Sequence, residues 1–307
     1  MENNYVVSYV NPDTDGVACS IAMALLLSRK TNNTYVPGTF GNINPETKVV
    51  LEYCGLSSIK NMGSSLRNPS KIVLVDTHHI EQLPKGFPSE KVCLIIDHHD
   101  KGDDSVFPNA LIDNRKIGAA ASIVAEKCIN EKVIDEKLGK LLACAIVSNT
   151  LNFTATSTSD FDRKIFDRLS QQYPIDNIII KKMFEQRGNV FKRGFKYAME
   201  SDMKKYNLHN GILGISQIEA YDLLKIVEIN SIVEALKAVI EEQQLDYCLF
   251  NGVDVHLKQS IVICGNLSSK KIASLIFKKD FSESYEQFDR VLQRKTDFVP
   301  FLDIVRK

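Results

Sequence analysis

The stretch VSYVNPDTDGVACSIAMALLL, residues 7–27, passes from a strand-like apolar run straight into a helix-like one. The joining segment, NPDTDG, holds two carboxylates, Asp13 and Asp15, two residues apart. A buried strand followed at once by a buried helix is typical of a parallel sheet, because parallel strands need crossover connections and helices supply them. Taken alone, the segment also suits a plain turn in which Asp15 caps the helix.

The pattern continues over the first half of the chain. Short β-branched runs alternate with helical periodicity from residue 4 to about residue 150, and the runs are apolar enough to be buried on both faces. The predicted strands are 5–10, 34–39, 71–76 and 92–97, and the predicted helices are 17–30, 46–54, 117–130 and 135–147. This alternation predicts an α/β fold with a doubly wound parallel sheet.

The second half of the chain has a different sequence pattern. Residues 160–200 are helical and charged, and strand-like pieces follow near 211–218, 246–252 and 260–264, with a long helical pattern at 227–243. Since single cores rarely grow beyond roughly 250 to 300 residues, a chain of 307 residues favours two domains. We expect one domain at 1–185 and a smaller α/β domain at 190–307.

Composition narrows the class of protein. Lys plus Arg equals Asp plus Glu at 38 each, so the chain has no net positive charge that would attract long nucleic acids or anionic membranes. The seven cysteines show no CxxC spacing and lie mostly in apolar runs, which suits reduced thiols. The N-terminal residues lack the pattern of a signal peptide, and no apolar run approaches membrane-spanning length. These features favour a cytoplasmic protein.

Acidic and imidazole side chains recur where predicted strands end. Asp13 and Asp15 follow the first strand, Asp76 ends the third, and IIDHHD at 95–100 ends the fourth. Ligand sites of such sheets lie at the carboxyl ends of the strands. Burying several carboxylates there without partners would cost several kcal/mol each, so a divalent cation such as Mn²⁺, Mg²⁺, Co²⁺ or Zn²⁺ is expected among them.

A basic motif lies in the second half, GNLSSKKIASLIF at 265–277, where a strand end leads into a helix. A helix N-terminus with two lysines is suited to binding an oxyanion. The same residues are equally typical of a solvent-exposed helix face. Metal ions on one domain and lysines on the other predict a phosphohydrolase whose site lies in the cleft between them.

The order of the motifs resembles the DHH phosphoesterase superfamily with a DHHA2 second domain. The motifs are NPDTDG, LVD, IIDHHD, IGAAASIVAEK, AIVSNTLNF and SSKK, and GNINPETKVVLEYCGL at 41–56 adds to them. Within that superfamily, the chain is similar to the manganese-dependent family II inorganic pyrophosphatases and the related exopolyphosphatases. The resemblance implies a dinuclear Mn²⁺ or Co²⁺ centre, Mg²⁺ at the substrate, a small phosphate-containing substrate and a homodimer.

The resemblance also implies roles for individual residues. The implied metal-ligand positions are Asp13, Asp15, Asp76, His98 and Asn149. The implied substrate-binding residues are His99, Lys204, Ser268, Lys270 and Lys271, and the implied catalytic residues are His99, Asp76 and Lys204.

Four positions depart from the family pattern. Tyr9 stands where the family has a histidine ligand, Asn149 where it has an acidic one, Ser269 where it has an arginine, and Thr77 where a histidine follows the bridging Asp. Losing a carboxylate and an imidazole should weaken binding of both ions, Mn²⁺ and Co²⁺ more than Mg²⁺, so one or two ions are expected. One hypothesis is that His78 or His79 replaces the missing nitrogen ligand.

The leading prediction is a metal-dependent hydrolase of phosphoanhydride bonds, of inorganic pyrophosphatase or exopolyphosphatase type. Two alternatives stay open: a DHH-type phosphodiesterase acting on small nucleotides, and a degenerate member with a binding or regulatory role. The first lacks support because no GGGH-like run is present. The second alternative, a binding or regulatory role, is suggested by the changed ligand positions Tyr9 and Asn149.

Overall fold

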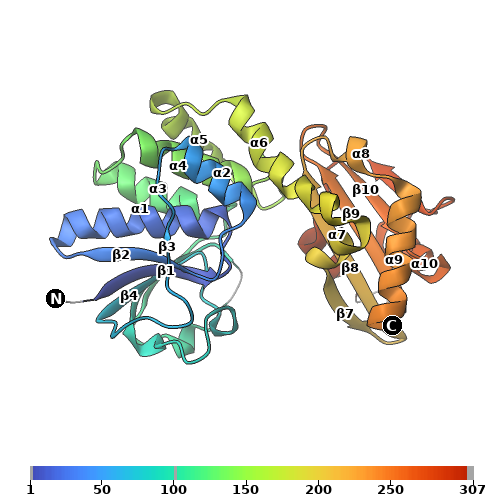
Figure 1. Cartoon of the computed structure of the whole chain (residues 1–307), viewed down its shortest axis with the longest axis horizontal. Coiled ribbons are helices and arrows are strands. Elements are labelled where there is room, and N and C mark those ends of the chain that lie inside the picture. Colours follow the sequence, from blue (N-terminus) through green and yellow to red (C-terminus); the bar gives the residue numbers. More distant parts are fainter. Residues whose placement is uncertain (1–2, 100–101, 303–307) are drawn as a thin grey trace. The chain divides into compact units, whose positions relative to one another are not determined.

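The structure is a computed structural model, which describes residues 3–99 and 102–302. The chain divides into two compact units, one ending at Met183 and one beginning at Phe184, and the division falls within helix α6 (Asn177–Gly188). No helix among the described residues is long and apolar enough to cross a membrane. The two units are described separately (Figure 1).

A six-stranded parallel sheet forms the centre of the first unit, in the order β3-β2-β1-β4-β5-β6. Its strands are β1 (Asn4–Val10), β2 (Tyr35–Phe40), β3 (Lys60–Asn61), β4 (Lys71–Val75), β5 (Val92–Asp97) and β6 (Leu111–Asn114). The order reverses between β1 and β4, which makes their carboxyl ends the topological switch point where ligands bind in such folds. The predicted fold class of the first unit is confirmed.

Helices and short 3₁₀ segments cover the two faces of this sheet. The helices are α1 (Thr14–Thr31), α2 (Pro45–Tyr53), α3 (Ala120–Asn130), α4 (Glu136–Asn149) and α5 (Asp160–Gln172). α1, α3 and α4 pack on one face, where residues such as Val73 and Ile123 are buried (Figure 1). The opposite face is closed by Leu83 and Phe107, beside the 3₁₀ segments η1 (Ile80–Gln82), η2 (Ser89–Lys91) and η3 (Asp104–Val106).

The second unit contains a smaller mixed sheet in the order β11-β10-β9-β8-β7. Its strands are β7 (Lys204–Leu208), β8 (Gly211–Ala220), β9 (Tyr247–Asp254), β10 (Gln259–Cys264) and β11 (Tyr285–Phe288). Only β8 and β9 are parallel among these pairs.

The two faces of the second sheet carry different helices. The helical elements are η4 (Asn189–Arg193), α7 (Phe195–Ser201), α8 (Leu223–Ile226), α9 (Ile229–Gln243), α10 (Leu267–Phe277), the π-helical turn η5 (Arg294–Phe298) and η6 (Val299–Phe301). Residues of α7 and α9 bury one face, whereas residues of α10 and the C-terminal turns bury the other. The expectation of a second, smaller α/β domain is confirmed.

Candidate metal centre and active site

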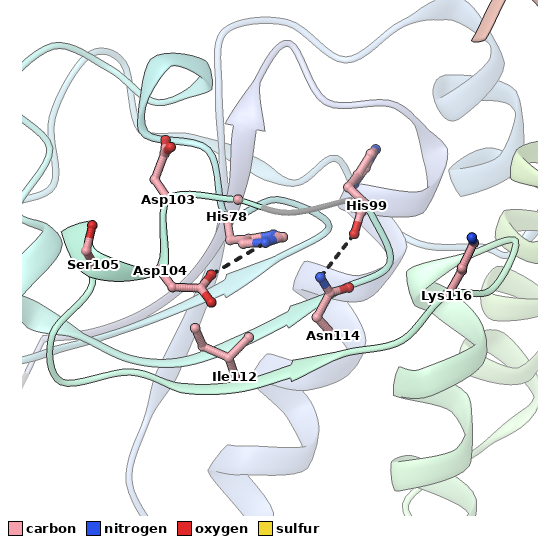
Figure 2. A pocket seen from close by; sticks show the side chains of 9 residues that line it. His78, His99, Asp103, Asp104, Ser105, Ile112, Asn114 and Lys116 are labelled. Atoms are coloured by element: carbon pink, nitrogen blue, oxygen red, sulfur yellow. Dashed lines mark hydrogen bonds and ion pairs between the residues drawn. The ribbon is translucent and has the colours of Figure 1, made fainter. Parts of the chain in front are cut away.

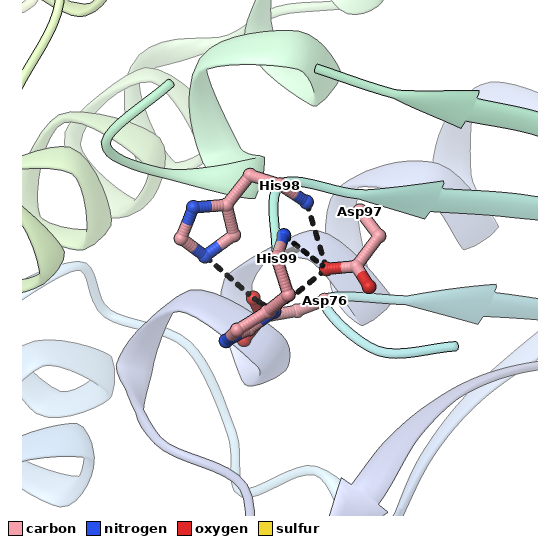
Figure 3. Close-up of side chains that lie close together, drawn as sticks. All are labelled: Asp76, Asp97, His98 and His99. Carbon is pink, nitrogen blue, oxygen red and sulfur yellow. Dashed lines mark hydrogen bonds and ion pairs between the residues drawn. The ribbon is translucent and has the colours of Figure 1, made fainter. Parts of the chain in front are cut away.

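The carboxyl ends of β1, β4 and β5 bring the chemically active side chains of the first unit together. β4 lies between β1 and β5 in the sheet, so the segments that follow these strands are neighbours. Asp76, Asp97, His98 and His99 each offer one ligand atom, and these four atoms all lie within 4.8 Å of one another (Figure 3). This grouping marks the candidate metal centre.

Asp76 carries the strongest indication that this is a cation site. It is 1% exposed, and its Oδ1 has no hydrogen-bond partner among the described residues. The ring Nε2 of His98 lies 3.3 Å from Oδ1. Burial raises the pKa of Asp76 well above its ordinary value, and the charges of Asp13 and Asp97 add to this effect. A buried carboxylate without donors needs a cation to be stable as an anion.

The backbone at Asp76 turns its side chain away from the strand direction. Its φ of 61° is left-handed, a conformation that Asp tolerates better than most residues. The strand therefore ends here. Backbone strain of this kind often accompanies functional sites.

His98 presents a nitrogen lone pair to Asp76. Its Nδ1 lies 3.0 Å from the carbonyl oxygen of Ile117, to which the ring N–H donates. In the neutral ring this leaves the lone pair on Nε2. Metal-binding histidines are usually held in this way, with the second ring nitrogen bonded to a carbonyl or carboxylate.

Asp97 organises the two histidines instead of offering free oxygen atoms. Its Oδ1 accepts the backbone N–H groups of His98 and His99 at 2.7 and 3.3 Å, and Nδ1 of His99 at 2.8 Å. Its Oδ2 is bonded to Nδ1 of His78. Burial alone would raise the pKa of Asp97, but the hydrogen bonds from His99 and His78 outweigh it and lower the pKa.

Asp13 joins the start of α1 to this centre. Its Oδ1 caps the helix by accepting the N–H groups of Asp15 and Gly16 at 2.9 and 3.1 Å. Its own N–H donates to the hydroxyl oxygen of Tyr9 at 3.1 Å. Burial, with the charges of Asp13 and Asp76, raises the pKa of Tyr9 well above its ordinary value. Tyr9 therefore remains a neutral phenol and cannot replace an imidazole ligand.

The carboxylate of Asp15 is fully occupied by hydrogen bonds. Its Oδ1 accepts from the N–H of Ala121 at 2.7 Å and the thiol of Cys19 at 3.4 Å. Its Oδ2 accepts from the N–H of Ala120 at 2.8 Å and the amide of Asn149 at 3.0 Å. A carboxylate has about four lone-pair positions, so none is left for a metal ion in this arrangement.

Asn149 directs its amide nitrogen at Asp15 and its neighbours. Besides Asp15, its Nδ2 lies 2.9 Å from the carbonyl of Gly118 and 3.2 Å from Nε2 of His98. Three acceptors around one terminal atom identify it as the nitrogen. After Asn149 the chain makes an unusual turn, in which three consecutive residues, Leu151, Asn152 and Phe153, have left-handed φ values of 49°, 53° and 64°.

Cys19 is the remaining partner of Asp15. Burial, followed by the charges of Asp15 and Asp76, raises its pKa well above that of a free thiol. It therefore stays protonated and acts as a hydrogen-bond donor.

These residues fit one divalent ion. Asp76 supplies an unsatisfied oxygen and His98 a nitrogen 3.3 Å from it, while Asp13, outside the four-residue cluster, acts on Asp76 through its charge. Carboxylate and imidazole ligands together suit Mn²⁺ and similar ions. A second ion would require the Asn149 amide to leave Asp15.

A cavity of about 660 Å³ borders this centre (Figure 2). His99 belongs both to the four-residue cluster and to the lining of this cavity. The lining is polar apart from Ile112: it consists of His78, His99, Gly102, Asp103, Asp104, Ser105, Ile112, Asn114 and Lys116. The hypothesis that His78 replaces the missing nitrogen ligand is not supported, because its Nδ1 is bonded to Asp97 and its Nε2 lies 3.7 Å from Oδ1 of Asp104.

The predicted substrate residues other than His99 belong to the second unit. Lys204 is exposed at the start of β7. Ser268 and Lys271 are exposed on the first turn of α10, whereas the ammonium of Lys270 donates to the carbonyl of Ser282 at 2.6 Å.

Arg294 is a cation near Lys204 that the sequence analysis missed. Its guanidinium, in a side chain only 12% exposed, lies 2.9 Å from Oδ2 of Asp202 and donates to the carbonyl of Ile215 at 3.0 Å. Ile215 is the register partner of Lys204 in the sheet. The adjacent Arg294 and Lys295 in LQRKT, residues 292–296, are the signal that could have identified it.

Proton release should accompany metal binding. Burial and the charges of Asp13 and Asp97 raise the pKa of Asp76, so this group holds a proton at a pH where a free Asp is ionised. We expect Mn²⁺ affinity to rise with pH, by about tenfold per pH unit for each proton displaced. Calorimetry in buffers of different ionisation enthalpy measures this release directly.

Asp160→Asn, at an exposed position, serves as the control and should leave the affinity unchanged. Binding heats that do not depend on the buffer, with an affinity that does not depend on pH, would contradict the expectation.

The exchange Asn149→Asp should raise the number of bound Mn²⁺ ions from one to two, because it replaces a donor to Asp15 with a ligand. Without metal, the variant should lose about 1–3 kcal/mol of stability, since Asp15 and Gly118 would face an unpaired carboxylate. Metal analysis and urea denaturation check both outcomes. Asn152→Asp makes the same charge change three residues away and should alter neither quantity. Equal stoichiometry in Asn149→Asp and wild type would refute this account.

Comparison with known proteins places the chain in a family. Residues 3–146 match the DHH family, N-terminal domain, and residues 181–305 match the DHHA2 domain. A manganese-dependent inorganic pyrophosphatase of Methanothrix thermoacetophila is 26% identical over 306 residues, covering 98% of both chains. One of Methanocaldococcus jannaschii is 27% identical over 316 residues, covering 97% of this chain and 98% of the relative.

Solved structures agree with this placement. A Methanococcus jannaschii protein assigned to the family II inorganic pyrophosphatases is 25% identical, with a TM-score of 0.73 and 99% of each chain covered. An exopolyphosphatase-related protein of Bacteroides fragilis shares the fold at 14% identity, with a TM-score of 0.52 and coverage of 99% of this chain and 93% of that one. The chain therefore belongs to the DHH family and carries a DHHA2 domain as its second unit.

Proposed function

We propose that the protein is a metal-dependent hydrolase of phosphoanhydride bonds, of inorganic pyrophosphatase or exopolyphosphatase type. One observation carries the proposal: the buried, unpartnered oxygen of Asp76 faces the available nitrogen of His98. Relatives that align with nearly the whole chain are named manganese-dependent inorganic pyrophosphatases. The same relatives give the phosphodiesterase and regulatory alternatives no support.

The cofactor is Mn²⁺, with Co²⁺ or Mg²⁺ as substitutes. When bound, such an ion polarises a phosphoryl oxygen and lowers the pKa of a coordinated water. Asp13, Asp76 and His98 hold the first ion. Asp15 and Asn149 line the position of a second, which the Asn149 amide disfavours.

His99 supplies a proton or hydrogen bond to the substrate phosphate. Burial by itself lowers its pKa, but the hydrogen bond to Asp97 and the charge of Asp76 outweigh it and raise the pKa overall. The ring is therefore cationic at a higher pH than a free imidazole. Because Asp97 occupies Nδ1, Nε2 is the nitrogen left for a phosphate oxygen.

Cations of the DHHA2 domain carry the remaining phosphate charge. Lys204 is the first of these residues. Arg294 is its preferred companion, because its guanidinium is anchored next to Lys204 by Asp202 and Ile215, and Arg matches phosphate geometry better than Lys. The α10 group of Ser268, Lys270 and Lys271 is the second candidate for this role.

Phosphate release tests the activity. With Mn²⁺, we expect hydrolysis of pyrophosphate, tripolyphosphate or long polyphosphate, no release from a generic phosphodiester, and loss of activity on chelation. Asp76→Asn should lower kcat/KM by roughly three orders of magnitude or more, because it removes the ligand on which the centre depends. Failure to hydrolyse any of the three anhydrides would refute the proposal.

Matched variants separate the two candidate sets of cations. Lys204→Ala should cost about 10²–10³-fold in kcat/KM, the usual cost of one transition-state contact. Arg294→Lys, which keeps the charge but loses the planar fork, should also lower it. Lys270→Ala and Lys271→Ala should change it little. A reversed pattern would assign the phosphate charge to α10.

We also propose that the protein is a cytoplasmic homodimer that pairs through the first unit. The seven cysteines are free, which suits a reducing compartment. The edge strand β6 exposes Leu111 (75%) and Ile112 (38%), and unpaired apolar edges favour pairing with another chain.

Light scattering after size-exclusion chromatography tests the dimer. Leu111→Asp should convert a dimer into a monomer, because it places a charge in the paired edge. Leu275→Asp, at a 52% exposed position in the second unit, is the control and should stay dimeric. A monomeric wild-type protein would exclude the dimer.

A further inference from the structure

His78 is a buried histidine to which the proposed chemistry gives no role. It follows Asp76 by two residues, and its side chain is 1% exposed. Its Nδ1 is bonded to Oδ2 of Asp97, the first residue of the Asp-His-His sequence. The ring therefore connects the segment after β4 to the segment after β5.

The opposite side of the ring is held by residues 102–104. A Cβ atom on Gly102 would lie only 1.9 Å from Cδ2 of His78, so the glycine allows the ring to fit closely. The N–H of Asp103 donates to the backbone carbonyl of His78 at 3.0 Å. Oδ1 of Asp104 lies 3.7 Å from Nε2 (Figure 2). These contacts hold the ring against Asp97 on the side of residues 102–104.

The bond from His78 divides the two oxygens of Asp97 between different partners. Oδ2 faces His78, so Oδ1 is directed at the backbone N–H groups and at Nδ1 of His99 (Figure 3). Without His78, Oδ2 would be a buried acceptor lacking its donor. The carboxylate could then rotate and release the ring of His99.

We propose that His78 is a positioning residue: it fixes the carboxylate of Asp97, which in turn holds His99 with its proton on Nδ1 and Nε2 free. The role of His99 toward phosphate rests on the proposed function, but the effect of His78 on the His99 ring does not. His78 also ties the segment that carries Asp76 to the one that carries His98 and His99.

Ring nitrogen NMR of the metal-free protein tests the positioning directly. At alkaline pH, where the ring is neutral, wild-type His99 should show the form protonated at Nδ1. His78→Leu removes the donor and should shift His99 toward a mixture of both forms. His98 is the internal reference, because the carbonyl of Ile117 holds its Nδ1 independently. An unchanged His99 signal in His78→Leu would overturn the proposal.

Two amide variants keep the test valid if His78→Leu folds poorly. The Asn amide nitrogen takes the place of Nδ1, whereas the Gln nitrogen takes the place of Nε2. His78→Asn should therefore preserve the His99 signal, and His78→Gln should not. His79→Asn is the neighbouring control and should leave the signal unchanged, because Asp97 receives no bond from His79 in the described contacts.

Kinetics show whether the positioning matters for turnover. His78→Leu and His78→Gln should lower kcat about 10–100-fold with little change in KM, the usual cost of losing a supporting hydrogen bond, and His78→Asn should restore most of it. Equal kcat values in His78→Asn and His78→Gln would overturn the claim that this positioning supports turnover. If no variant or wild type hydrolyses an anhydride, the proposed function fails while the NMR result still decides the role of His78.

Discussion

A buried carboxylate at the carboxyl end of an internal strand, with one oxygen that no donor satisfies, is the constraint on which the site depends. Asp76 lies at the switch point of the strand order, where the ends of β1 and β5 flank it. Its negative charge is unfavourable in that position unless a cation is present. The nearby charges of Asp13 and Asp97 make the ionised form still less favourable. The surrounding hydrogen bonds leave this oxygen free, whereas both oxygens of Asp15 and of Asp97 accept donors.

The neighbouring carboxylates of Asp15 and Asp97 differ from Asp76, because both of their oxygens accept hydrogen bonds. Asp15 accepts donors from α1, α3 and α4, so it holds three helices to one point. Asp97 accepts donors from two strand-end segments and fixes the histidines. Removing a donor from either would leave a buried acceptor unpaired, at a cost of about 1–3 kcal/mol. The same residue type thus serves as a structural anchor in two positions and offers a free oxygen in the third.

Much of the fold could be predicted from the sequence, because buried strands and amphipathic helices leave periodic patterns. The strand predicted at 92–97 is β5, and the helix predicted at 17–30 is the interior of α1. The short edge strands β3 and β6 were missed, since two and four mainly exposed residues carry no such pattern. The 3₁₀ segments between β4 and β5 were missed for the same reason.

The site was predictable in its residue types but not in its contacts. The DHH motif and the two Asp residues of NPDTDG predict a metal centre, and the structure brings Asp76, Asp97, His98 and His99 together. Whether Asn149 accepts a metal or donates to Asp15 depends on three acceptors from separate elements, which only the folded chain brings together. The bond of His78 to Asp97 and the anchoring of Arg294 beside Lys204 likewise depend on tertiary contacts between distant residues.

The thiol of Cys19 has a consequence for the charge of the site. A thiolate next to Asp15 would add a negative charge to a group of buried carboxylates. Burial and the acidic surroundings raise the pKa of the thiol, so the sulfur contributes a weak donor and no negative charge. Cys19 thereby fills the space beside Asp15 without adding to the repulsion among Asp13, Asp15 and Asp76.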